Sequence, residues 1–150
     1  MVTIGLNKIA YLIIFPILIS CENTLSETND EICETYVAGN KGFWLDVYAE
    51  DLKDDELTFT LNKGKITPKS KEIGLVKTGF FITDCVKLSD TLSVAYKSKV
   101  YKIYDFKNLT EIALNGSNHK KNKICRVSTA KVNGKIIPDS DNNVLKMALK

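Results

Sequence analysis

Hydrophobic and polar side chains alternate along much of the chain beyond residue 31, as they do in strands that bury one face. Residues 57–61 show the pattern most clearly, with Leu57, Phe59 and Leu61 on one side and two threonines on the other. The segments that alternate, or that are rich in aromatic and β-branched residues, are 43–49, 57–61, 80–88, 91–96, 100–106, 124–132 and 145–149. No stretch of helix length repeats its apolar residues convincingly with the helical period. The pattern therefore predicts an all-β domain.

Turn residues separate these segments at short intervals. Asn133-Gly134 is the strongest of them, because both residues tolerate the positive φ that a two-residue hairpin turn requires. Residues 39–42 and 62–65 are typical of longer hairpin turns. We therefore expect about eight strands, joined mostly by hairpins, in a small antiparallel β-sandwich or barrel.

The first twenty residues follow a different pattern. Lys8 precedes an uninterrupted apolar run over residues 9–19, which is the arrangement of a secretory signal. The run is short for a membrane-spanning helix, which needs roughly 20 apolar residues. Pro16 also disfavours a stable helix within it. These features predict an exported protein.

The sequence Leu18-Ile19-Ser20-Cys21 directly follows and resembles the lipobox of bacterial lipoprotein precursors. The resemblance covers residues 1–21 only. It implies that residues 1–20 are a signal peptide, cut before Cys21, and that the Cys21 thiol receives diacylglycerol. The new amine is usually acylated as well, for example with palmitate. Several acyl chains on one residue are enough for stable anchoring in a membrane.

Two alternatives to the lipoprotein remain at this point, an uncleaved N-terminal anchor and an ordinary secreted protein. If the lipobox is used, the residue after the cysteine bears on the destination. By resemblance, Glu22 in place of an aspartate favours the outer membrane, with the domain on its periplasmic face, in bacteria that have two membranes.

The chain then divides into a tether and one domain. Residues 22–31 are polar and acidic with almost no apolar side chains, which is typical of a flexible linker. We therefore expect a lipidated cysteine and tether over residues 21–31 and a single all-β domain over residues 32–150. A chain of 150 residues leaves no room for a second domain.

Removal of the signal leaves Cys33, Cys85 and Cys125 in an oxidising compartment, where a disulfide is expected. Three cysteines allow three single pairings. We predict a bond between Cys85 and Cys125, because both lie in predicted strands whereas Cys33 lies near the tether. The pairing of Cys33 with Cys125 is the main rival.

Charge is distributed unevenly. Residues 21–56 contain eleven acidic and two basic side chains, whereas residues 57–150 contain eighteen basic and seven acidic ones. Such asymmetry either marks faces with different partners or cancels when the two parts pack together.

Catalytic and metal-binding patterns are missing from the sequence. His119 is the only histidine, and neighbouring lysines place it in a polar loop. The carboxylates at 51–56 and 139–141 are more typical of solvated turns than of calcium sites. No nucleotide-binding or hydrolase motif occurs. We expect no enzyme activity, no cofactor, no metal and no nucleic-acid partner.

A basic segment with tyrosines is the candidate binding surface. It comprises Lys99, Lys102 and Lys107 together with Tyr101 and Tyr104. The strict period of a strand puts Tyr101 and Ile103 on one face, and Tyr104 and Phe106 on the other. An ordinary solvated face explains the lysines equally well.

These observations favour a membrane-anchored envelope lipoprotein that binds a protein partner. An inhibitor or immunity protein directed against a toxin or a cell-wall hydrolase has this plan of lipid tether, β-domain and disulfide. An accessory lipoprotein of envelope assembly or surface interaction is the alternative.

Overall fold

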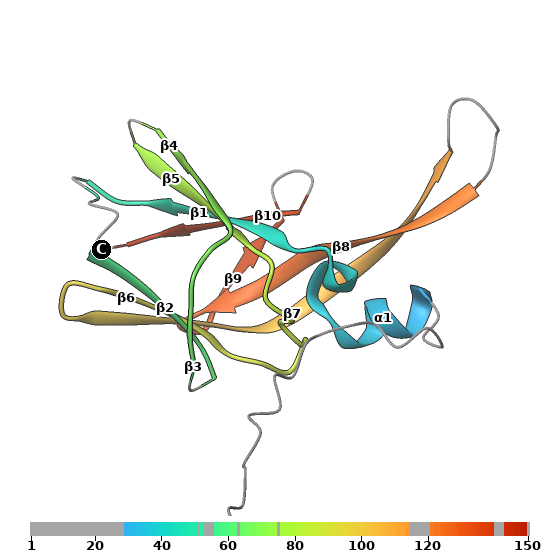
Figure 1. Ribbon diagram of the computed structural model, residues 1–150, viewed down its shortest axis with the longest axis horizontal. Coiled ribbons are helices and arrows are strands. Elements are labelled where there is room, and N and C mark those ends of the chain that lie inside the picture. The colour runs from blue at the N-terminus through green and yellow to red at the C-terminus, as the bar shows by residue number, and fades with distance from the viewer. Residues whose placement is uncertain are drawn as a thin grey trace, which may run out of the picture.

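The computed structural model describes residues 29–50, 52, 56–62, 64–74, 76–114, 121–139 and 143–149. The described part is mostly β-structure in two sheets, which confirms the predicted all-β fold. Its two helical turns are α1 (Asn29–Thr35) and η1 (Val37–Asn40). The strands are β1 (Phe43–Tyr48), β2 (Leu57–Leu61), β3 (Gly64–Ile66), β4 (Ser70–Ile73), β5 (Lys77–Ile82), β6 (Leu92–Tyr96), β7 (Lys99–Leu114), β8 (Lys121–Val132), β9 (Lys135–Pro138) and β10 (Val144–Ala148). Figure 1 shows α1 at one end of the long axis and the C-terminal end of β10 at the other.

The two sheets are joined along the chain. The six-stranded sheet has the order β3-β2-β6-β7-β8-β9, and the four-stranded sheet has the order β10-β1-β5-β4. Neighbouring strands pair antiparallel except β1 and β10, which are parallel. Asp139, after β9, forms an isolated bridge with Leu145 in β10, and its Oδ1 accepts a hydrogen bond of 2.9 Å from the Val144 amide. At this corner the chain passes from the six-stranded sheet to the four-stranded sheet.

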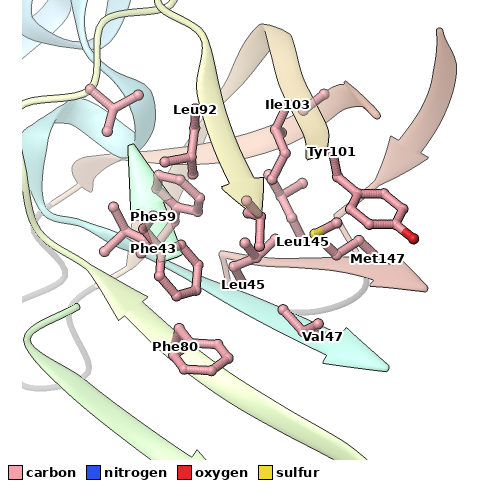
Figure 2. Close-up of a cluster of buried hydrophobic side chains, with 14 of the residues drawn as sticks. Phe43, Leu45, Val47, Phe59, Phe80, Leu92, Tyr101, Ile103, Leu145 and Met147 are labelled. Carbon is pink, nitrogen blue, oxygen red and sulfur yellow. The ribbon is translucent and has the colours of Figure 1, made fainter. Parts of the chain in front are cut away.

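The core lies between the sheets and is made by alternate residues of each strand (Figure 2). In β1 the inward residues Phe43, Leu45 and Val47 are each at most 1% exposed. The rings of Phe59 and Phe80, from opposite sheets, lie 4.9 Å apart between centroids. Burial of apolar area on this scale is the main force that holds two sheets together.

Two predicted elements need correction. The segment 80–88 is a strand only as far as Ile82, because its second half pairs with the helical segment instead: the Val37 amide donates to the Val86 carbonyl, and the Leu88 amide donates to the Thr35 carbonyl. Helix α1 begins at Asn29, inside the segment predicted as tether. Its seven residues are too few to show a helical period in the sequence. The strands β3 and β4 were not predicted, since each has only three or four residues.

The predicted hairpin at Asn133-Gly134 is confirmed. Both residues have positive φ, 47° and 88°, and they connect β8 to β9. The side chain of Asn133 also accepts a hydrogen bond from the Lys102 amide at 2.9 Å, which ties the turn to β7. The turn residue therefore also contributes to the neighbouring strand.

The strands β7 and β8 each carry a bulge where they extend beyond the two packed sheets, which together we call the barrel. Between the pairs Tyr104–Lys131 and Lys107–Thr129, β7 has one residue more than β8. Between the pairs Lys107–Thr129 and Asn108–Val127, β8 has one residue more than β7. Asp105 adopts φ of 55° at the first bulge. Each bulge exchanges the two faces of its strand. The expectation that Phe106 faces away from Tyr101 is therefore wrong, because both are buried.

The disulfide joins Cys33 to Cys125, with the Cα atoms 5.7 Å apart. The predicted pairing of Cys85 with Cys125 is therefore wrong. The physical reason is that α1 lies against β7 and the adjoining η1 lies against β8, which brings Cys33 next to Cys125 although the two are 92 residues apart in the sequence. Cys85 lies after β5 and takes no part in this bond.

Asn108 of β7 fastens the end of α1 to the same face. Its Nδ2 donates to the carbonyl oxygens of Cys33 and Tyr36 at 2.6 and 2.7 Å. Its Oδ1 accepts from the Ala38 amide at 2.9 Å. One side chain thus pairs three backbone groups that a short helix leaves without partners at its end.

Candidate functional site

The outer face of the six-stranded sheet carries a line of polar residues from four strands. Lys65 of β3 pairs with Thr60 of β2, Thr60 pairs with Ser93 of β6, and Ser93 pairs with Lys102 of β7. Directly paired residues lie on the same face of a sheet. Their strand neighbours Phe59, Val94 and Ile103 are buried in the core, and this line must therefore point outward.

A second line lies farther along β7. Tyr104 pairs with Lys131 of β8, and Lys131 pairs with Ile136 of β9. Ile136 is 68% exposed, so this line also faces solvent. Beyond the bulge, Lys107 is exposed next to the buried Phe106.

We call these outward residues together the lysine face. It consists of Thr60, Lys65, Ser93, Lys102, Tyr104, Lys107, Lys131 and Ile136. Threonine and serine, whose side chains are short, lie between the lysines of the first line. Such a surface suits a flat, negatively charged partner.

Asp105 is the acidic residue that interacts with the lysines of this face. Its carboxylate is 2.8 Å from Lys131 Nζ, and this hydrogen bond, with the charges of Lys131 and Lys107, lowers the pKa of Asp105. The same hydrogen bond raises the pKa of Lys131. Within the part of the chain that the structure describes, no carboxylate forms an ion pair with Lys65, Lys102 or Lys107.

The structure places the five residues of the predicted basic segment on different faces of β7. Lys102, Tyr104 and Lys107 lie on the lysine face. Tyr101 is only 8% exposed and belongs to the core, so its place in the predicted binding surface is a correction. Lys99 pairs with the buried Tyr96 at the turn between β6 and β7, which places it on the inner side of the strand. Because side chains alternate between the two faces of β7, the five predicted residues do not form one surface.

Lys65 and Lys131 were missed in the sequence. Lys65 lies in a strand of three residues, which has no readable alternation. Simple alternation from Cys125 and Val127 puts Lys131 on their buried face, but the bulge in β8 turns it outward. No sequence signal marks this bulge.

Several predicted residues lie outside the described residues, namely Cys21, His119 and the carboxylates of 51, 54 and 55. Among the residues that are described, no group of three histidine, cysteine or acidic side chains is placed to hold a metal ion. No described helix has the length and apolar character to cross a membrane.

Comparison with protein-family models, curated proteins and solved structures finds no match to this chain.

Proposed function

We propose that the protein is a lipid-anchored envelope protein whose lysine face binds an acidic protein partner. The observation that supports this most directly is the line Lys65–Thr60–Ser93–Lys102, which gathers lysines from strands far apart in the sequence onto one open face. An inhibitor or immunity protein for a toxin or cell-wall hydrolase is the form of this function that we favour.

A protein partner fits this surface better than a nucleic acid does. A lipid anchor, which the resemblance of residues 1–21 to a lipoprotein signal implies, would hold the domain in the cell envelope, where a protein rarely meets nucleic acid. Two side chains on the face, Tyr104 and Ile136, also offer apolar area for a protein interface. Positive charge speeds the encounter with an acidic surface, and the apolar side chains then contribute to affinity.

The anchor would hold the domain by the end that carries α1. Seven residues lie between Cys21 and Asn29, the first residue of α1, so the two are eight chain steps apart. A fully extended chain spans about 3.3–3.6 Å per residue, so this linker reaches roughly 28 Å at most. The end of the domain that carries α1 would therefore lie close to the membrane surface.

Mass spectrometry of the mature N-terminus tests the anchor. We expect an acylated Cys21 as the first residue, and a Cys21→Ser protein that keeps its signal or leaves the membrane. A sulfur that carries diacylglycerol cannot form a disulfide. An intact Met1, or a peptide that links Cys21 to Cys85, would therefore contradict the anchor.

Charge reversal tests the face. A triple variant with Lys65, Lys102 and Lys107 changed to glutamate should slow association with a partner co-purified from membranes by about ten-fold or more, with the effect fading at high salt. The matched control changes Lys41, Lys69 and Lys146, which are exposed elsewhere, to glutamate. Both variants shift the net charge equally. Equal loss in both, or loss in neither, would contradict the proposal.

The identity of the co-purified partner separates the two forms of the function. A single toxin or hydrolase whose activity falls on binding supports inhibition. A multi-protein envelope complex supports the alternative, an accessory lipoprotein of envelope assembly.

A further inference from the structure

The β7–β8 arm carries exposed apolar side chains on both of its faces. We use this name for the part of the hairpin beyond the two bulges, residues 107–114 and 121–127, which projects past the sheets in Figure 1. On the arm Leu109 is 51% exposed and Ile112 is 63% exposed. Successive residues of a strand point to opposite faces, and no bulge separates these two, so they lie on opposite sides of the arm. A flat partner bound to one side would cover only one of them.

Helix α1 covers only part of one face of the arm. Cys33 of α1 is bonded to Cys125 on this face, and its sulfur lies 3.5 Å from the Thr110 hydroxyl oxygen. Ile112 is the next residue of β7 on the same face and stays exposed beyond this contact. Leu109 lies on the face that α1 does not touch. The packing of α1 on the arm therefore leaves both apolar side chains accessible.

The chain enters the described domain beside Ile112. The first described residue is Asn29, and the carboxylate of the next one, Asp30, lies 2.7 Å from Lys123 Nζ. Lys123 pairs directly with Ile112 across the arm. The eight chain steps from Cys21 to Asn29 span roughly 28 Å at most. A lipid on Cys21 would therefore hold this part of the arm at the membrane surface.

We propose that the arm lies in the surface of the lipid bilayer that carries the anchor, with Leu109 and Ile112 inserted at the boundary between headgroups and acyl chains. This inference rests on the lipid anchor of the proposed function. A fluid bilayer surrounds a ribbon and covers both of its faces at once, which a flat protein surface does not. Apolar side chains of elements that lie on a membrane reach roughly 5–10 Å into this boundary.

The rest of the arm suits this shallow depth. Arg126 pairs with Leu109 and Lys123 with Ile112, so a long basic side chain lies beside each apolar one and can extend to the lipid phosphates. Both basic side chains form ion pairs at the protein surface, where such pairs are weak enough to be exchanged. Along the described arm β7 and β8 pair only with each other. Their outer backbone edges need hydrogen bonds that hydrocarbon does not offer, so the arm lies on the bilayer and does not cross it.

Fluorescence quenching by brominated lipid tests the proposal. The full chain with Leu109→Trp or Ile112→Trp is reconstituted into vesicles of phosphatidylcholine and phosphatidylglycerol, with and without bromine on the acyl chains. The matched control is Val100→Trp, at a position 55% exposed near the other end of β7. The parent protein gives the background from Trp44, its one tryptophan. We expect each arm tryptophan to lose about half or more of its fluorescence to bromine, and the Val100→Trp control to lose little.

Quenching of neither arm tryptophan, of only one of them, or of Val100→Trp to the same extent would overturn the proposal. Mass spectrometry of the same samples keeps this result separate from the test of the anchor. An acylated Cys21 with unquenched arm tryptophans would overturn the inference and leave the anchor intact. Quenched arm tryptophans on a chain without lipid at Cys21 would support contact between the arm and the bilayer, and would contradict the anchor.

Discussion

The barrel and the β7–β8 arm are two regions that hold their shape by different means. The arm is the part of the hairpin beyond the bulges, residues 107–114 and 121–127, and Figure 1 shows it projecting past the sheets. In the barrel Leu92 and Ile103 are 0% exposed, whereas on the arm Leu109 and Ile112 are 51% and 63% exposed. The arm therefore buries too little apolar area to be stable by packing alone.

Covalent and polar bonds take the place of a core on the arm. The disulfide from Cys33 and the three hydrogen bonds of Asn108 fasten α1 to one of its faces. An ion pair of 2.7 Å between Lys123 and Asp30 joins them at the surface. A two-stranded ribbon can thus extend from a small domain when a short helix is bonded to it.

The largest expected effect comes from removal of the disulfide. Cys33 and Cys125 are 92 residues apart, and for a loop of this size the loop-closure entropy stabilises the folded state by about 4–5 kcal/mol. Replacing both cysteines with alanine should lower the free energy of unfolding by about that amount in denaturant titrations. A loss below about 1 kcal/mol would show that α1 and the arm hold together without the bond.

Two leucine-to-alanine variants compare the contribution of packing in the barrel with that on the arm. Leu92→Ala creates a cavity in the barrel core and should cost about 2–5 kcal/mol. Leu109→Ala on the arm deletes the same atoms from a side chain that is half exposed, and it should change stability by about 0.5 kcal/mol or less. Similar losses in the two variants, measured by the same unfolding assay, would contradict the distinction between the regions.

Asn108 tests the polar part of the attachment. Asn108→Ala leaves one amide and two carbonyl groups without partners and should destabilise the protein by about 1–3 kcal/mol. Hydrogen exchange should show the loss first at the Ala38 amide, which donates to Asn108. Asn108→Asp should be at least as harmful, because a carboxylate there faces the carbonyl oxygens of Cys33 and Tyr36. A harmless aspartate would show that the hydrogen bonds contribute little.

The barrel could be predicted from the sequence far better than the arm. Alternation located β2 and β6 within a residue, and Asn133-Gly134 located the last hairpin, because local chemistry dictates these elements. The face of Lys131 and the pairing of Cys33 depend on bulges and on how α1 packs, which no local pattern specifies. For the same reason the lysine face was predicted only in part.

The smallest expected effect concerns Asp105 and Lys131, at the boundary between barrel and arm. Hydrogen bonding to Lys131 lowers the pKa of Asp105 below 3.8, and the same bond raises the pKa of Lys131 above 10.5. The stabilising contribution of Asp105 is therefore present above pH 3.8 and is lost as the pH falls through its folded pKa. That of Lys131 is present below pH 10.5 and is lost as the pH rises through its own folded pKa. In Lys131→Met, carboxyl NMR titration should show the pKa of Asp105 rising back to its ordinary value of 3.8 or slightly above it, because the desolvation that raises this pKa outweighs the remaining charge of Lys107. Both partners are well exposed, so the stability of the variant should barely change. An unchanged pKa would show that Lys131 does not pair with Asp105 in solution, whereas a marked loss of stability would show that the boundary depends on this pair as the arm depends on its disulfide.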